Sequence, residues 1–337
     1  MSFDASIFKT LAAGERPSAA DFKAALTSVL QGEANDAQIA ALLLGLEMLG
    51  MSAQEVRVGT EVMREAMTPL HIEYDVIDIV GTGGTGLHTL SISTASALVC
   101  AGAGAKVAKH GNRAASSLTG TADTLEELGV SLSVSIEKCG ECIAGAGVGF
   151  LFAPNHHPAM RHVGPARKAL GVRTLFNMLG PLCNPAGAKR QLLGVCDDSW
   201  RRPMAEALRD LGAEHVWVVH GQDGLDEIST TTKTHVTEIK DGQIREFVIV
   251  PEDYGVVRTQ MDTLRGGAPA DNAKALSELL KGTHGPYRDI VVLNSGAALM
   301  LAGIAEDIAV GMALAMQSID SGAAKAALAR LVEISNA

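Results

Sequence analysis

Four glycines stand within the six positions 81–86, directly after the short apolar segment 76–80. A backbone without Cβ atoms can approach a ligand closely, and glycine accepts the left-handed conformations that a curling loop needs. A run of hydroxyls follows at Thr89, Ser91, Ser93 and Thr94, and then the apolar segment 95–103. Backbone N–H groups that lead into a helix N-terminus bind anions. The stretch therefore predicts a phosphate-binding loop between a buried strand and a helix.

A second polar stretch follows the apolar residues 105–108. It holds Lys109, His110, Asn112 and Arg113, followed by several hydroxyls. Such a polar segment would be costly to bury in a hydrophobic core, so we expect it to be a second loop beside the glycine loop. Together the two loops would bind a ligand with more than one phosphate. No Gly-Lys-Ser/Thr ends the glycine loop, and no acidic residue ends a second strand at the dinucleotide spacing. The pattern is therefore neither a P-loop nor a dinucleotide fingerprint.

Two more polar groups stand farther along the chain. Residues 150–185 contain many histidines and arginines and a lysine, interspersed with prolines. Among them, Arg167 is the candidate for binding a substrate carboxylate through two parallel hydrogen bonds. The adjacent carboxylates Asp226 and Glu227 follow the apolar residues 216–219 and suit Mg²⁺, the alternative being an Asp- and Gly-rich turn. Ligands of open parallel sheets bind at the carboxyl ends of strands, so these groups are expected to converge.

The apolar pattern divides the chain in two. Residues 1–70 read as helices, with Ser18 and Asp21 spaced as a capping box and with Asp36 and Ser52 as further caps. A segment near 165–185 is expected to join this helical domain, and residues 69–74 form a linker. The remaining residues, 75–337, read as an α/β domain.

In this second domain apolar strands alternate with helices, which predicts a mainly parallel central sheet flanked by helices. The expected strands are 76–80, 106–108, 148–152, 192–195 and 216–219, and the helices between them are 93–103, 122–128, 136–144, 157–170 and 202–211. A hairpin is expected over 235–239 and 243–248, and closing helices over 271–281, 288–302, 304–317 and 322–334.

Composition narrows the possible functions. The 337 residues carry a net charge of −10 and only 4% aromatics, which argues against nucleic-acid binding. The most apolar run, 39–49, is too short to span a membrane. Five cysteines, an odd number, without a signal peptide predict a cytoplasmic protein with free thiols. Cys139 and Cys142 have CxxC spacing, but no second pair accompanies them.

In combination, the motifs resemble those of the anthranilate phosphoribosyltransferase family. The stretches that carry the resemblance are GTGG…TLSIST, AKHGNRAASS…GTAD, FLFAP…HPAM…R…LGVRTLFNMLGPLCNPA and VVHG…GLDE. They span nearly the whole chain. The resemblance implies a helical and an α/β domain joined by hinges, in a homodimer formed through the helical domain. It also implies transfer of the phosphoribosyl group of 5-phospho-α-D-ribose 1-diphosphate (PRPP) to the amine of anthranilate in tryptophan biosynthesis, with two Mg²⁺ ions per subunit.

The resemblance further implies the roles of individual residues. Lys109, Asn112 and Arg167 would be catalytic, and Ser93, Asp226 and Glu227 would hold Mg²⁺. The PRPP contacts would be Gly81, Gly84, Thr85, Thr89, Ser91, Ile92, Ser93, Thr94, Lys109, His110, Gly111, Asn112, Arg113, Ala114, Ala115, Ser116, Ser117, Leu118 and Thr121. Anthranilate would be held by Gly81, His110, Asn112, Arg167 and Pro181.

Two positions depart from the family pattern, which normally has Asp where this chain has Thr85 and Asn where it has Ser91. Loss of a carboxylate beside diphosphate removes a group that organises Mg²⁺ and also removes a like-charge repulsion. We therefore expect an altered Mg²⁺ dependence or PRPP affinity.

Two other functions stay open at this stage. A pyrimidine nucleoside phosphorylase would share the fold, but Arg167 and the NMLGPLCNP run argue against it. A non-catalytic or nucleic-acid-binding paralogue is compatible with Thr85 and Ser91. The acidic composition and the intact pair of Asp226 and Glu227 count against that second alternative.

Overall fold

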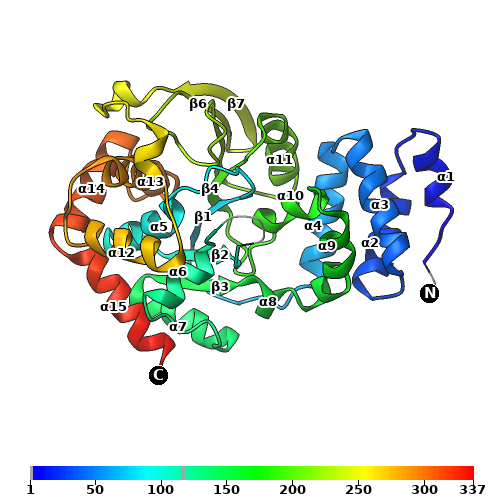
Figure 1. Cartoon of the computed structure of the whole chain (residues 1–337), viewed down its shortest axis with the longest axis horizontal. Helices are drawn as coiled ribbons and strands as arrows, with labels where there is room; N and C mark the ends of the chain where they lie inside the picture. Colours follow the sequence, from blue (N-terminus) through cyan, green and yellow to red (C-terminus); the bar gives the residue numbers. More distant parts are fainter. Residues whose placement is uncertain (1–2, 115–117) are drawn as a thin grey trace.

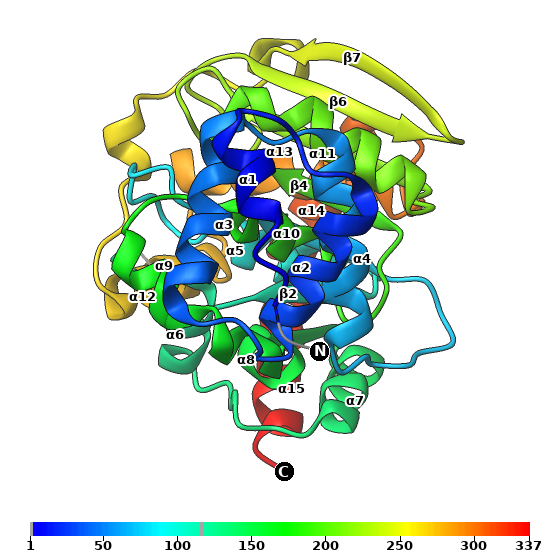
Figure 2. The same ribbon diagram turned by 90° about the vertical axis from the view of Figure 1, so that its right-hand side faces the viewer.

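The N-terminal helices form a bundle at one end of the molecule. The computed structural model describes residues 3–114 and 118–337. The bundle consists of α1 (Ile7–Ala12), α2 (Ala19–Leu30), α3 (Asp36–Leu49) and α4 (Ala53–Ala66), drawn in blue in Figure 1 and facing the viewer in Figure 2. The predicted caps Ser18 and Ser52 are confirmed. The cap of α3 is Asn35 instead of the predicted Asp36, because Asn35 and Gln38 satisfy each other's backbone N–H groups.

Within the described residues, seven strands form one sheet in the order β3-β2-β1-β4-β5-β6-β7. The strands are β1 (Ile77–Gly81), β2 (Val107–Gly111), β3 (Val148–Phe152), β4 (Arg190–Gly194), β5 (His215–Gly221), β6 (Thr234–Lys240) and β7 (Gln243–Ile249). Strands β1 to β5 are parallel and the last two pairings are antiparallel, so the predicted mainly parallel sheet is confirmed. The chain runs outward from β1 to β3 and then returns to β4 on the other side of β1. This topological switch point is where open α/β sheets bind ligands.

Helices cover both faces of the sheet (Figure 1). They are α5 (Ile92–Gly102), α6 (Thr121–Glu127), α7 (Ile136–Ala146), α8 (Ala153–His156), η1 (Pro158–His162), α9 (Gly164–Leu170), α10 (Leu175–Leu182), α11 (Asp198–Asp210), η2 (Pro251–Tyr254), η3 (Met261–Leu264), α12 (Pro269–Leu279), α13 (Pro286–Leu301), α14 (Ile308–Asp320) and α15 (Ala323–Ser335). In β1, Ile79 packs into the core that contains α5 and α13, while its neighbour Val80 packs into the core that contains α4 and α11. Among the described residues, no helix is both long and apolar enough to cross a membrane.

Several predicted boundaries are wrong for identifiable reasons. The helix expected over 157–170 is broken into η1 and α9, because Pro158 and Pro165 each stand in the first turn of a new helical segment. Helix α10 was not predicted, since Gly180 and Pro181 argue against a helix that burial nevertheless stabilises. Strand β2 continues through Lys109 to Gly111, where the prediction placed a loop, because β3 pairs with it along its whole length.

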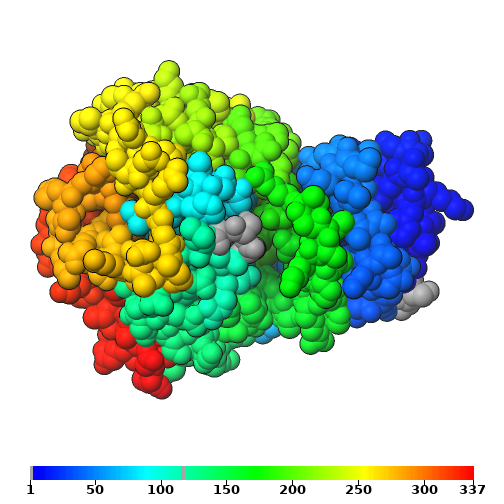
Figure 3. Space-filling model, viewed as in Figure 1, coloured from blue at the N-terminus to red at the C-terminus, as the bar shows by residue number. Residues whose placement is uncertain are grey.

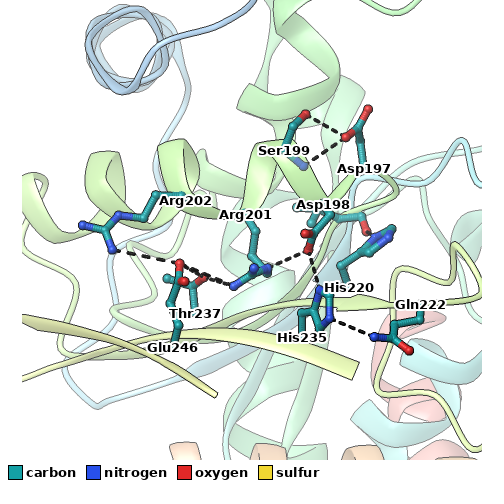
Figure 4. A network of polar contacts seen from close by, with 11 residues as sticks. Asp197, Asp198, Ser199, Arg201, Arg202, His220, Gln222, His235, Thr237 and Glu246 are labelled. Atoms are coloured by element: carbon teal, nitrogen blue, oxygen red, sulfur yellow. Dashed lines mark hydrogen bonds and ion pairs between the residues drawn. The ribbon is translucent and has the colours of Figure 1, made fainter. Parts of the chain in front are cut away.

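The predicted hairpin of β6 and β7 is present, with Asp241 and Gly242 both at positive φ in its turn. A polar network ties this hairpin to the N-terminal half of α11 (Figure 4). Arg201 pairs with Asp198 of its own helix and donates to Thr237 of β6. Asp198 accepts a contact from His235, whose other ring nitrogen lies 3.0 Å from Gln222 Nε2 in the loop after β5.

Two glycines bring α13 and α14 into close contact. A Cβ added at Gly311 would lie 2.2 Å from the Gly296 carbonyl oxygen, and one added at Gly296 would lie 2.8 Å from the Met312 nitrogen. Backbone atoms line both positions, so neither could move aside as a flexible side chain does. The two helices therefore cross at a distance that only glycine permits.

We predict that Gly311→Ala lowers the free energy of unfolding by about 1–3 kcal/mol, the usual cost of overpacking. Ala313→Ser, which also adds one heavy atom but on the exposed side of α14, should change it by less than about 0.5 kcal/mol. Chemical denaturation of the two variants and the unmodified chain measures both values. Equal stability of the Gly311→Ala variant and the unmodified chain would refute the close crossing.

Candidate active site

The glycine loop curls back over the sheet at the end of β1. Gly83, Gly84 and Gly86 all have positive φ, which side chains rarely tolerate. The Gly83 N–H donates to Asp226 Oδ2 at 2.8 Å, across 143 residues of sequence. The sequence-predicted phosphate loop and one of the three predicted metal ligands are therefore in direct contact.

A glycine on the neighbouring strand β4, to which no sequence motif assigns a role, makes the contact between Gly83 and Asp226 possible. Gly194 ends β4 and is the register partner of Gly81 at the end of β1. An added Cβ at Gly194 would lie 1.7 Å from the Asp226 carbonyl oxygen, and one at Gly81 would lie 2.4 Å from Asp226 Oδ2. The Asp226 backbone thus lies against Gly194, and the Asp226 side chain lies against Gly81.

Lys109 is buried in β2 and points toward the end of β1. Its ammonium donates to the Ile79 carbonyl at 2.6 Å and to Ser93 Oγ at 3.1 Å. Burial lowers the pKa of Lys109, while the carboxylates of Asp78 and Glu227 oppose that shift. Lys109 therefore provides a cation beside the N-terminal turn of α5.

Asp226 and Glu227 reach the same cavity from the loop after β5. Burial raises the pKa of both carboxyl groups, and for Glu227 the neighbouring Asp226 charge adds to the effect. Because the two carboxylates are buried and adjacent, their ionised forms are unfavourable unless a cation binds beside them. The pair of carboxylates therefore fits Mg²⁺. Nowhere in the described chain do three or more His, Cys, Asp or Glu side chains form a metal cage. An ion held here needs further oxygens from a hydroxyl, water or substrate, and Ser93 Oγ is available nearby.

The loop that carries these carboxylates is fixed by its own hydrogen bonds. Asp223 accepts from the Leu225 N–H at 3.1 Å and from Ser229 Oγ at 2.6 Å, so its side chain contacts the loop on both sides of the carboxylate pair. The contact between Gln222 and His235 joins the loop to the network of Figure 4. The carboxylate pair is therefore presented by a braced turn.

Asp78 holds three segments together beneath the site. Its buried carboxylate accepts from the His110 N–H at 3.2 Å and from Asn184 Nδ2 at 2.7 Å, and Asn184 also donates to the Ala108 carbonyl at 2.8 Å. Burial raises the pKa of Asp78 to about 6. The contact links β1 and β2 to the segment after α10, which explains why polar residues are buried here.

The other end of the cavity combines apolar side chains with the cation of Arg167. Arg167, in the last turn of α9, donates to Asn177 Oδ1 at 3.3 Å, and its guanidinium lies 5.6 Å from the centre of the Phe176 ring. Met63, from α4 of the helical bundle, and Met160 also line this end. A flat apolar ligand with a carboxylate fits such a surface, since the stacked guanidinium keeps its remaining donors for an anion.

Two buried histidines also line the cavity. The rings of His110 and His157 lie 5.1 Å apart, centre to centre, and both are buried. Burial, followed by the neighbouring histidines, lowers the pKa of His110 well below its usual value, and burial lowers that of His157 to about 4. Both rings are therefore uncharged near neutral pH. His110 Nε2 is buried and has no hydrogen-bond partner within the described chain.

One cavity of about 690 Å³ joins the two ends, and Figure 3 shows the surface hollowed between the teal segment and the green segment. The structure brings every described residue of the predicted site to its wall. These are Gly81, Gly84, Thr85, Thr89, Ser91, Ile92, Ser93, Thr94, Lys109, His110, Gly111, Asn112, Arg113, Ala114, Leu118, Thr121, Arg167, Pro181, Asp226 and Glu227. Ala115, Ser116 and Ser117 lie outside the described residues. Sequence reasoning assigned no role to Met63, His157 or Phe176, which also line the cavity; His157 stands in the polar stretch 150–185, whereas nothing in the sequence distinguishes Met63.

The two departures from the family pattern have modest local partners. Thr85 Oγ1 accepts from the Leu87 N–H at 3.3 Å, and Ser91 Oγ lies 2.8 Å from Thr124 Oγ1. Arg173 donates to the Gly84 carbonyl at 2.8 Å, so a cation stands beside the position where the family pattern has a carboxylate. The loop is thus positioned without an acidic residue at position 85.

Comparison with known proteins agrees with this geometry. Residues 5–67 match the family model described as "Glycosyl transferase family, helical bundle domain", and residues 73–325 match "Glycosyl transferase family, a/b domain". The fold and the cavity thus define a glycosyl transferase of this family, to which the chain belongs.

Comparison with individual relatives indicates which enzymes of this family the chain resembles. The chain is 52% identical to the anthranilate phosphoribosyltransferase of Parvibaculum lavamentivorans over 331 residues, 98% of this chain and 97% of that one. It matches the crystal structure of the Thermus thermophilus enzyme of that name with a TM-score of 0.92 at 43% identity, covering 98% of this chain and 99% of the other. The Saccharomyces cerevisiae enzyme in complex with PRPP and Mg matches with a TM-score of 0.90 at 27% identity, over 98% and 97% of the two chains. The predicted resemblance to the anthranilate phosphoribosyltransferases is confirmed.

We predict that Gly194→Ala weakens binding of PRPP with Mg²⁺ by about tenfold or more, because the new Cβ displaces the Asp226 backbone. Isothermal titration calorimetry with both ligands measures the change. Gly145→Ala on α7 is the matched control, since its Cβ would meet only the tip of the Ile334 side chain, which can move aside. Unchanged affinity in the Gly194→Ala variant would show that the Asp226 segment is not constrained as described.

Proposed function

We propose that this chain transfers the 5-phosphoribosyl group of PRPP to the amine of anthranilate, giving N-(5-phosphoribosyl)anthranilate and diphosphate in tryptophan biosynthesis. The observation that carries the proposal is the single cavity with an anion-binding end and an apolar end that contains Arg167. The yeast relative was crystallised with PRPP and Mg, and also with 4-fluoroanthranilate, which supports these two substrate classes.

The polar end suits the diphosphate of PRPP. When the C1–O bond of the ribose breaks, positive charge develops on the ring and negative charge on the departing diphosphate. The Lys109 ammonium and the N-terminal end of α5 stabilise that negative charge more strongly as it grows, which lowers the barrier. Ser93, Asp226 and Glu227 would hold Mg²⁺, which when bound supplies further neutralisation of the phosphate oxygens.

The apolar end suits anthranilate. Arg167 and Asn112 bind and orient the acceptor, its ring lying among the apolar side chains near Phe176 and Pro181. The amine is neutral and already nucleophilic, so orientation toward C1 provides the main contribution. His110 lines the cavity uncharged, so it adds no positive charge that would repel the developing cation on the ribose.

The remaining assignments are proposals of the same kind. We propose two Mg²⁺ ions per subunit, a helical domain of residues 1–70 joined by a segment near 165–185, and an α/β domain of residues 75–337. We also propose a homodimer formed through the helical domain, which is supported by the exposed apolar side chains of Leu44 and Met48 on α3. All five cysteines are free, which supports a cytoplasmic location.

Arg167→Ala should raise the KM for anthranilate about 10- to 100-fold, because a charge-assisted contact to the carboxylate contributes about 1.5–3 kcal/mol. The loss of anthranilate fluorescence after addition of PRPP and Mg²⁺ measures the rate. Lys168→Ala is the control, since Lys168 is exposed on the same helix. No Mg²⁺-dependent loss of fluorescence with the unmodified chain would refute the proposed activity; an unchanged KM in the Arg167→Ala variant would refute only the role of Arg167.

Thr85→Asp restores the carboxylate of the family pattern beside Arg173 and the Gly84 carbonyl. We expect a change of up to about fivefold in the Mg²⁺ concentration that gives half-maximal PRPP binding, since an exposed ion pair contributes about 0.2–1 kcal/mol. Thr85→Asn separates charge from size, and it should behave like the unmodified chain. Identical Mg²⁺ and PRPP dependence in all three proteins would exclude a role for position 85.

A further inference from the structure

Helix α13 contacts the first half of the proposed cation site through Tyr287. The Tyr287 hydroxyl donates to the Ser91 carbonyl at 3.0 Å. Ser91 precedes α5 directly, and Ser93, the proposed Mg²⁺ ligand, follows two residues later. Tyr287 therefore fixes the backbone two residues before Ser93.

The same helix holds the second half through Asn294. This fully buried side chain accepts from the Ile228 N–H at 2.9 Å and donates to the Ile228 carbonyl at 2.8 Å. Ile228 follows Glu227 directly, so the clamp fixes the backbone next to that carboxylate. Asn294 also donates to the Ile290 carbonyl of its own helix at 2.8 Å, which restricts the side chain to this orientation.

The two contacts are two helical turns apart, about 10 Å along the axis. Helix α13 is itself held against α14 at two places. Arg288, buried near its start, donates to Asp320 of α14 at 2.9 Å, and Gly296 makes the close crossing with α14. A rigid helix that hydrogen-bonds to both strand-end loops fixes the distance between them.

We propose that α13 sets the separation between Ser93 and the pair of Asp226 and Glu227, with Tyr287 and Asn294 as positioning residues for the cation and diphosphate. The inference rests on the proposed function, because it assigns these two residues to the binding of PRPP with its metal. Neither residue is among the predicted site residues, and each acts through the backbone of a neighbouring loop.

Tyr287→Phe tests the proposal with the loss of one hydroxyl. The readout is Mn²⁺ binding in the presence of PRPP, followed by electron paramagnetic resonance, which does not depend on turnover. We expect the dissociation constant of Mn²⁺ to rise about three- to tenfold, as the loss of one hydrogen bond produces. In steady-state assays the KM for PRPP should rise while the KM for anthranilate stays constant.

Tyr254→Phe is the matched control, because Tyr254 lies on η2 and has no described contact with either loop. Asn294→Ala provides a second arm, in which a thermal melt without ligand separates loss of fold from loss of binding. A folded Asn294→Ala variant with weakened Mn²⁺ binding supports the proposal.

Mn²⁺ affinity of the Tyr287→Phe variant equal to that of the unmodified chain overturns the inference, even if its melting temperature falls. Failure of the unmodified chain to bind Mn²⁺ with PRPP overturns the proposed function and this inference together. The two failures are therefore distinguishable from one set of titrations.

Discussion

The site depends on the approach of one peptide segment to the ends of two adjacent parallel strands. Asp226 lies so close to the ends of β1 and β4 that a Cβ at Gly194 would meet its backbone and a Cβ at Gly81 would meet its carboxylate. This contact brings a carboxylate to the glycine loop, where the Gly83 N–H meets it. Because β1 and β4 meet at the switch point of the sheet, the loops on either side diverge and leave room for a ligand above the contact.

The charged side chains that line the cavity are only partly neutralised by their neighbours in the protein. Lys109 is buried with two neutral acceptors, while Asp226 and Glu227 repel each other. A ligand that brings both anionic phosphates and a divalent cation satisfies all three side chains at once. The same burial keeps His110 and His157 uncharged, so the site holds few permanent charges between its two ends.

Both the α/β part of the chain and the helical bundle contribute to the cavity. Tyr287 and Asn294 of α13 hold the two loops at the polar end, whereas Met63 of α4 reaches the apolar end from the bundle. A ligand that occupies both ends therefore contacts both parts of the chain. This arrangement explains why α10, with its internal Pro181, is retained as a helix: it packs against α4 and lines the cavity at the same point.

The sequence by itself determined the alternation of strands and helices, the glycine loop, and the chemical types of residue that surround a phosphate, because these follow from local periodicity and from the chemistry of single side chains. It missed Gly194, Tyr287 and Asn294, whose roles consist of contacts with segments far away in the chain. It also ended β2 too early, since Lys109 is polar but pairs with Phe150 of β3 and donates its ammonium to the Ile79 carbonyl of β1. Only the tertiary structure decided which loops meet and how closely, because those distances are set by long-range packing that no local pattern encodes.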